Sequence, residues 1–408
     1  MTPECAATQA VTAHSAARLS SERPSASAWS SDRGGSGRRL LEQAIACRDR
    51  YEFSAALELS LEAVDAIEAD EGPESPSLVQ VLIVLTSVQQ VGSSLDEAER
   101  VSLRAVAVAE KLPVSPELVP LRLRSFESLA VTYRLQGRYA EAEDVFRRAI
   151  AEAEEHLGED AAPVADLLSG LAIAFKYSGR FDEAEGLYRR ALAIAERAYG
   201  VDSSAVASIY HNLGGLQHAR GDYEAAEPLA RRSVELRTRA TGATDTDVAA
   251  DKAALAAVLY RLGRDEEAES LLREALELFQ RVYGDTHYEI AVNLNNVAAI
   301  LHKRGELAEA ESLYRRALSI KEELLGPDHP ELASTLNNIA VLCRAQGRYA
   351  EAEPLYRRAL MLLERALEPS HPNLTSCLEN YASLLRLMGR QAEAADLEAR
   401  VGLGERAV

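Results

Sequence analysis

Basic side chains recur at one position of a regular repeat along this chain. The repeat has a period of 42 with a single step of 44, and the position reads Arg48, Gln90, Arg134, Lys176, His218, Tyr260, His302, Arg344 and Arg386. Because the chain has 45 Lys and Arg and 8 His among 408 residues, about one of these nine positions would be basic by chance, whereas seven are. A row of cations can bind carboxylates. Alternatively, each cation lies in the last turn of a helix, where it stabilises the negative end of the helix dipole. The two interpretations are compatible.

A second set of polar residues lies seven positions before the basic ones. It includes His211, Asn295 and Asn337, and further asparagines follow at Asn212, Asn296, Asn338 and Asn380. Residues seven apart share one face of a helix. Amide side chains can hold a peptide backbone, although they could equally join neighbouring helices. We predict a peptide-binding surface formed by Arg134, Lys176, His211, His218, Tyr260, Asn295, His302, Asn337, Arg344 and Arg386.

Sequence motifs for catalysis are missing. The chain contains no GxxxxGK[ST], no HExxH, no GxSxG and no Cys and His at zinc spacing. His211 and His218, seven residues apart, share one helical face and could in principle hold a metal, but lone histidines on a polar groove more often form hydrogen bonds or contact a peptide. His287, His329 and His371 recur with the period of the repeat and indicate a structural role at helix starts. We therefore predict no enzymatic activity, no cofactor and no metal.

A periodic glycine reveals the elements that must position these side chains. It recurs with the same period at Gly137, Gly179, Gly221, Gly263, Gly305, Gly347 and Gly389. A helical pattern precedes and follows each one, and an alanine lies five residues after it, as at Ala310 and Ala352. Tyr51 and Ser93 hold the glycine position in two earlier units. We predict an all-α chain, a right-handed superhelical solenoid of about nine helical hairpins over residues 39–403.

The repeats resemble tetratricopeptide repeats, and in their 42-residue form they are similar to those of the kinesin light chain family. The string LNNVAAILHKRGELAEAESLYRRALSIKEELLGPDHPELA at 294–333 carries the resemblance, as does LNNIAVLCRAQGRYAEAEPLYRRALMLLE at 336–364. The resemblance implies that the first helix of each hairpin lines a concave groove in which peptides bind. Residues 1–38 show no heptads, so a link to a motor through a coiled coil is not expected.

Composition restricts the class of partner. The net charge is −19, which argues against nucleic acid and anionic membranes as partners. No apolar run approaches the length of about 18 residues that insertion into a membrane requires, and residues 1–38 lack a secretory signal. Those residues, rich in Ser, Ala and Arg, are predicted to be disordered, and 404–408 to be a short tail. The four Cys indicate reduced thiols in a cytoplasmic protein. The oligomeric state does not follow from the sequence.

Two functions fit these features. The first is a non-enzymatic adaptor that binds peptide segments of its partners in the groove, with acidic segments favoured by the basic row. The second is a ligand-responsive regulator whose superhelix senses a peptide and controls an enzyme or transcription factor. The sequence does not identify the partner.

Overall fold

The structure is a computed structural model that describes residues 35–91, 94–366 and 371–405. Within these residues it contains eighteen helices and no strands, and nine first helices of the repeat alternate with nine second helices along the chain. The first helices of the pairs are α2 (Ser36–Asp49), α4 (Pro76–Val91), α6 (Val119–Leu135), α8 (Ala162–Tyr177), α10 (Ser204–Arg220), α12 (Thr246–Arg261), α14 (Tyr288–Arg304), α16 (Leu332–Ala345) and α18 (Pro372–Leu387). The second helices are α3 (Phe53–Glu71), α5 (Leu95–Lys111), α7 (Tyr139–Leu157), α9 (Phe181–Tyr199), α11 (Tyr223–Thr241), α13 (Asp265–Tyr283), α15 (Leu307–Leu325), α17 (Tyr349–Ala366) and α19 (Gln391–Glu405). The predicted all-α hairpin fold is confirmed.

The described helices belong to two compact units that divide between residues 262 and 263. The N-terminal unit contains α2 to α12, and the C-terminal unit contains α13 to α19. Helix α2 begins at Ser36, slightly before the predicted start of the array at 39, and α19 ends at Glu405, slightly after its predicted end at 403. Residues 1–34 and 406–408, which include most of the predicted disordered segment and tail, lie outside the described residues.

The turn between α10 and α11 requires a left-handed residue. Gly221 ends α10 with φ 84°, and the next residue, Asp222, accepts a hydrogen bond from the backbone N–H of Ala225 to begin α11. Tyr51, which replaces the glycine in the first pair, has φ 63°. Because a residue with a Cβ rarely adopts this conformation, Tyr51 confirms that the first pair follows the same repeat.

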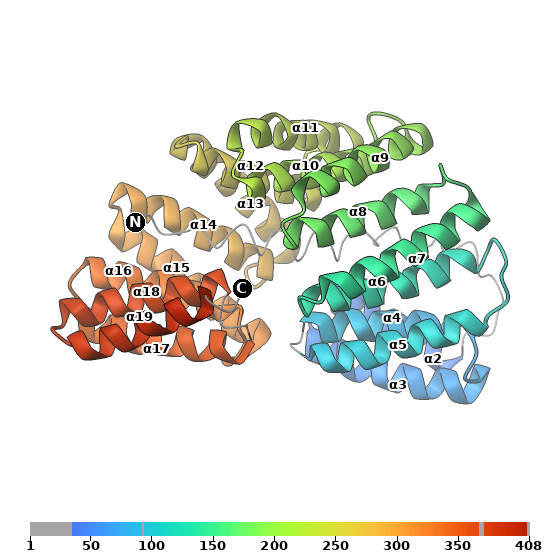
Figure 1. Ribbon diagram of the computed structural model, residues 1–408, viewed down its shortest axis with the longest axis horizontal. Helices are drawn as coiled ribbons and strands as arrows, with labels where there is room; N and C mark the ends of the chain where they lie inside the picture. Colours follow the sequence, from blue (N-terminus) through green and yellow to red (C-terminus); the bar gives the residue numbers. More distant parts are fainter. Residues whose placement is uncertain (1–34, 92–93, 367–370, 406–408) are drawn as a thin grey trace. The chain divides into compact units, whose positions relative to one another are not determined.

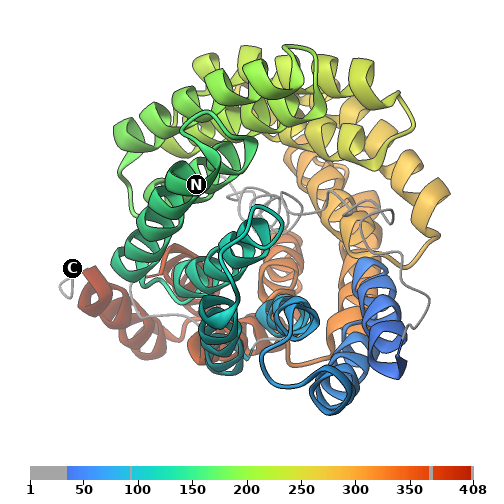
Figure 2. The ribbon, with the colours of Figure 1, turned by 90° about the vertical axis from the view of Figure 1, so that its right-hand side faces the viewer.

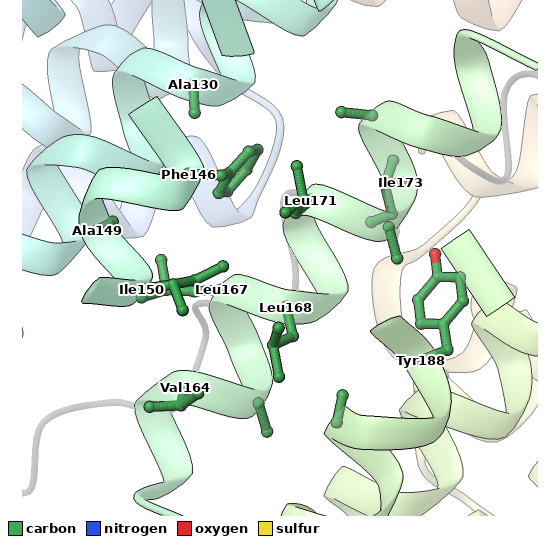
Figure 3. Packing of buried hydrophobic residues seen from close by; sticks show 14 of the residues in the cluster. Ala130, Phe146, Ala149, Ile150, Val164, Leu167, Leu168, Leu171, Ile173 and Tyr188 are labelled. Carbon is green, nitrogen blue, oxygen red and sulfur yellow. The ribbon is translucent and has the colours of Figure 1, made fainter. Parts of the chain in front are cut away.

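Small residues let the helices approach closely. An alanine lies seven residues before most of the periodic glycines, and each of these alanines is buried. Ala130, Ala172, Ala298 and Ala340 are fully enclosed. Within each unit, helices that follow one another in the chain lie side by side, as α8 to α11 show in green and yellow-green (Figures 1 and 2). Large side chains fill the remaining volume, and Figure 3 shows Phe146 of α7 directed towards α8 near Leu171.

Gly170 in α8 supplies a test of this close packing. A Cβ added there would lie 2.6 Å from the ring of the fully buried Phe146. We expect Gly170→Ala to lower the free energy of unfolding by about 1 to 3 kcal/mol, since an overpacked core must distort. Gly186, in the exposed part of α9, has open space within 4 Å of the point where a Cβ would lie, so Gly186→Ala should instead stabilise by up to about 1 kcal/mol. Urea unfolding of both variants measures the difference, and equal effects would contradict the packing.

The first helices form one continuous layer in each unit. Successive first helices contact one another, from α2 to α12 in the N-terminal unit and from α14 to α18 in the C-terminal unit. Successive second helices make no contacts of comparable extent in the described parts of the chain. The first helices therefore lie closer together, and the surface that they form within each unit, called here the first-helix face, is the more concave one.

Arginines near the turns join four of the repeats to the one before them. Arg138 binds Glu99 of α5 at 2.7 Å and Glu141 at the start of α7 at 2.5 Å. Hydrogen bonds from Gln136 and Arg138 hold the pKa of Glu99 below its usual value. The same arrangement recurs at Arg180 with Glu143 and Glu183, at Arg348 with Glu311 and Glu351, and at Arg390 with Glu353 and Glu393. Many carboxylates of this acidic chain are thus neutralised by arginines close to the second helices.

Candidate functional site

Three predicted site residues lie together on the first-helix face of the N-terminal unit. Arg134, Lys176 and His218 occupy the last turns of α6, α8 and α10, which contact one another in that order. Their side chains are only 6%, 9% and 9% exposed. Among the described residues, no carboxylate forms an ion pair or hydrogen bond with any of the three.

Tyrosine rings contact these cations. The guanidinium carbon of Arg134 lies 5.5 Å and the Nζ of Lys176 4.9 Å from the ring centroid of Tyr177. The ring of Tyr223 meets the ring of His218 edge-on at 5.1 Å and the guanidinium of Arg261 at 4.8 Å. Such contacts stabilise a cation only partly, by about 0.5 to 2 kcal/mol. We call Arg134, Lys176, His218 and Arg261, with Tyr177 and Tyr223, the basic strip.

Burial without an acidic partner changes the protonation of the strip. Desolvation, followed by repulsion from Arg134, lowers the pKa of Lys176 to about 7. Desolvation, followed by repulsion from Arg261 and Lys176, lowers the pKa of His218 to about 4. The Nδ1 of His218 is buried and has no hydrogen-bond partner. An anion placed here would satisfy groups that the protein itself leaves unsatisfied.

One carboxylate does lie on this face, at a distance from the strip. Glu127 of α6 is half-buried seven residues before Arg134, which is about 10 Å along the helix axis. Burial raises its pKa, and Arg124 opposes that effect. Its electrostatic partner is therefore Arg124, and the basic strip stays uncompensated.

His211 is held in a buried network. Its Nδ1 lies 2.7 Å from Oδ1 of Asp251 in α12, and the Nε of Arg237 in α11 donates to Oδ2 of Asp251 at 3.0 Å. Arg237 also donates to Ser204 and Ser208 of α10. His211 thus joins α10 to α12, and its predicted contact with a peptide stays a prediction.

The asparagines pair with one another between neighbouring first helices. The Nδ2 of Asn338 donates to Oδ1 of Asn295 at 3.3 Å, and the Nδ2 of Asn380 donates to Oδ1 of Asn337 at the same distance. These bonds connect α14 to α16 and α16 to α18. They confirm that the asparagines join helices, whereas peptide binding by Asn295 and Asn337 stays a prediction.

The remaining predicted residues differ from the strip. Tyr260 is half-buried at the end of α12. His302 has a buried Nδ1 without a hydrogen-bond partner, and burial, followed by repulsion from Arg344, lowers its pKa. Arg344 donates to the carbonyl oxygen of Asn380 at 3.1 Å, and Arg386 forms two hydrogen bonds with Glu398 of its own pair. The periodic basic position is therefore uncompensated from Arg134 to His218 but engaged at Arg344 and Arg386.

The linker histidines have the structural role that the sequence predicts. The Nδ1 atoms of His287, His329 and His371 each accept a hydrogen bond from the backbone N–H two residues later, at 3.2 to 3.3 Å. Over the described residues, no group of three or more His, Cys, Asp or Glu could hold a metal ion. None of the described helices has the length and apolarity required to span a bilayer.

Four residues of the site region are missing from the sequence prediction. Tyr177 and Arg261 lie one position after the periodic basic position, and Tyr223 lies two residues after Gly221. An aromatic next to a cation is the signal that could have found them. Asp251 occupies a position that is apolar or small in most other repeats, and an acid at a buried position needs a partner.

Comparison with known proteins agrees with this architecture. A family profile described as Tetratricopeptide repeat matches residues 121–197, 163–239, 248–323, 289–365 and 331–401, which together exceed half of the chain. Among curated proteins the sequence has no significant match.

Solved structures provide further likenesses. BtubC (BKLC) from P. vanneervenii is 25% identical, with a TM-score of 0.44, over 62% of this chain and 94% of that chain. A Rap protein complexed with Competence and Sporulation Factor is 16% identical, with a TM-score of 0.57, over 91% of this chain and 98% of that one. The quorum sensor NprR from B. thuringiensis, in its apo form, is 14% identical, with a TM-score of 0.56, over 90% and 98%. The last two likenesses concern the fold alone.

Proposed function

Because the chain belongs to the tetratricopeptide repeat family, we propose that it is a non-enzymatic interaction module that binds an acidic peptide segment of a partner on the first-helix face of its N-terminal unit. The observation that carries this proposal is the basic strip, where Arg134, Lys176 and His218 are buried with no acidic partner among the residues that the structure describes, in a chain of net charge −19. A peptide carboxylate would supply the missing charge.

The acidic side chains of the protein should make binding selective for short acidic segments. Glu99 and Glu143 are already paired with arginines, and the excess of acidic residues repels long polyanions. A short acidic segment can avoid this repulsion by entering the concave face. Its binding should weaken with added salt less steeply than that of a fully exposed ion pair, since buried charges are screened less.

Selection from a random peptide library tests the proposal. We expect peptides enriched by the wild-type protein to carry Asp or Glu, and Arg134→Met to reduce their binding at least tenfold. A matched control is Arg48→Met, which removes a basic residue from the same repeat position but one that lies outside the predicted surface and is already bound to Asp49. Thermal unfolding checks that both variants fold. Enrichment of neutral or basic peptides, or equal loss in the two variants, would refute the proposal.

A second candidate is a regulator that responds to such a peptide. A Rap protein complexed with Competence and Sporulation Factor has a similar fold over 91% of this chain. An adaptor should keep its shape on binding, whereas a regulator should change it. Small-angle scattering with and without a selected peptide distinguishes the two, and an unchanged radius of gyration would count against the regulator.

A further inference from the structure

Exposed leucines replace an ion pair at one position of the first two second helices. Ten residues after the periodic glycine, the third to eighth repeats have an exposed arginine that binds the glutamate four residues before it. These arginines are Arg147, Arg189, Arg231, Arg273, Arg315 and Arg357. The corresponding residues of α3 and α5 are Leu61, which is 49% exposed, and Leu103, which is 43% exposed. An apolar side chain therefore faces water where six other repeats have a charged one.

The two leucines belong to neighbouring helices of the N-terminal unit. Arg104 of α5 binds Glu68 of α3, so these helices lie next to each other (Figure 1). Because both leucines hold the same repeat position, the repeat directs them to the same side of the unit. Leu57, one helical turn before Leu61, replaces the glutamate of the usual ion pair and is half-buried. We call Leu57, Leu61 and Leu103 the leucine patch.

Unpaired carboxylates surround Leu61. Glu58 and Asp65 lie three residues before it and four residues after it, which places them beside it on the helix surface, and Glu62 follows it directly. All three are exposed, and none of their carboxylates forms an ion pair or hydrogen bond with the residues that the structure describes. Helix α3 contains six acidic residues and no basic one. The surface around Leu61 is therefore negative.

The charges beside Leu103 are already neutralised. Arg100, three residues before it, binds Glu97, and Arg104, directly after it, binds an acidic residue of α3. A partner can therefore gain apolar contact at both leucines but ion pairs only around Leu61. A single exposed leucine is ordinary on a protein surface. Two at the same position of neighbouring helices, with unpaired charges of one sign beside them, indicate an interaction surface.

We propose that the leucine patch and the carboxylates around Leu61 form a second docking surface, which binds a basic amphipathic helix of a partner protein. Such a helix has apolar side chains three or four residues apart along one face and charged side chains beside them. Its apolar side chains cover Leu61 and Leu103, and its Lys or Arg side chains pair with the three carboxylates. Exposed ion pairs contribute little affinity, so the leucines supply most of it and the carboxylates select a basic partner.

This surface goes beyond the proposed function. It is formed by second helices, whereas the acidic peptide of the proposed function binds on the first-helix face. The two surfaces also select partners of opposite charge. One chain can therefore hold an acidic segment and a basic helix at the same time, as a protein that connects two partners must.

Fluorescence anisotropy with a labelled leucine–lysine peptide, acetyl-LKKLLKLLKKLLKL-amide, tests the proposal. One control peptide has serine in place of every leucine, and another has the same composition in an order that gives no apolar face. We expect the wild-type protein to bind the leucine–lysine peptide at least tenfold more tightly than either control, because only this peptide offers both apolar contact and charge. Equal binding of a control peptide would overturn the proposal.

Uncharged substitutions test the leucines without altering the net charge. Leu61→Gln combined with Leu103→Gln should weaken binding at least tenfold. Val282→Gln is the matched control, since Val282 is 50% exposed in α13 of the C-terminal unit, and it should leave binding unchanged. Thermal unfolding checks that the variants fold, and the single change Leu61→Gln replaces the double one if the latter does not. Unchanged binding in the leucine variant, or an equal loss in the control, would overturn the proposal.

The carboxylates are tested in the same way. Glu62→Gln combined with Asp65→Asn should weaken binding at least threefold at low salt, whereas Glu266→Gln with Glu277→Gln removes two exposed acids of α13 and should not. Arg134→Met, which weakens binding of acidic peptides, should leave the affinity for the leucine–lysine peptide unchanged. A loss in Arg134→Met as large as in the leucine variant would overturn the separate surface, and failure of acidic peptides to bind would overturn only the proposed function.

Discussion

Replacing Lys176 by Met is expected to stabilise the free protein and to weaken its binding of acidic peptides. The side chain is 9% exposed, and desolvation with repulsion from Arg134 lowers its pKa to about 7. An apolar side chain of similar volume removes this unfavourable charge, and such replacements of buried ionic groups are neutral or stabilising by about 1 to 4 kcal/mol. The same change removes one cation of the basic strip, so binding of acidic peptides at pH 6.5 should fall at least tenfold.

The lowered pKa of Lys176 also predicts how the free energy of unfolding changes with pH. The folded-state pKa of Lys176 lies below that of an unfolded lysine, so between about pH 7 and pH 10 the unfolded chain binds more protons. The contribution of Lys176 to the free energy of unfolding therefore rises with pH across this window. In Lys176→Met that rise should be absent, and urea unfolding at several pH values measures it.

Lys321 is the matched control. It is 3% exposed in α15 of the C-terminal unit, but its Nζ donates to the carbonyl oxygen of Glu331 at 3.1 Å. Lys321→Met removes a buried lysine that has a partner, so any stabilisation should be smaller, and peptide binding should not change. Equal stabilisation by the two changes, or a Lys176→Met variant that is less stable than the wild type, would show that Lys176 is not an uncompensated charge.

Replacing Asp251 by Ala should produce the largest loss of stability. Asp251 is 1% exposed and binds both His211 at 2.7 Å and Arg237 at 3.0 Å. Without it, the buried guanidinium keeps only the oxygens of Ser204 and Ser208 as close partners, together with Asp247 at 3.7 Å. Removing one partner of a buried ion pair costs about 3 to 5 kcal/mol.

An exposed aspartate provides the comparison for Asp251. Asp182 also binds an arginine, Arg220 at 2.8 Å, but its side chain is 98% exposed. Asp182→Ala should change the free energy of unfolding by less than about 1 kcal/mol, because exposed ion pairs contribute little. If chemical unfolding showed similar losses for the two variants, the network around Asp251 would not be important for joining α10, α11 and α12.

The hairpins could be predicted from the sequence because local chemistry determines each of them. Gly221 takes the left-handed conformation that its place after α10 requires, and Ala298 and Ala340 are enclosed where the repeat requires small residues. The division into two units between residues 262 and 263 could not be predicted from the sequence, because the repeat period continues through Gly263 and Gly305.

The candidate site was only partly predictable. Equal spacing places Lys176 and Arg386 in one series, but Arg386 reaches Glu398, whereas Lys176 has no acidic partner in the described part of the chain. That difference depends on residues of other helices and cannot be read from a period. Similarly, the partners of Asp251 come from α10 and α11, 40 and 14 residues away in the sequence, and the repeat period does not reveal them.

Titration of the Lys176 side chain by heteronuclear NMR, with and without N-acetylated hexaglutamate, tests the central claim most directly. We expect a midpoint near pH 7 in the free protein, which moves upward by at least one pH unit when the peptide binds. A midpoint near that of an ordinary lysine in the free protein, or one that stays unchanged with peptide bound, would contradict the claim.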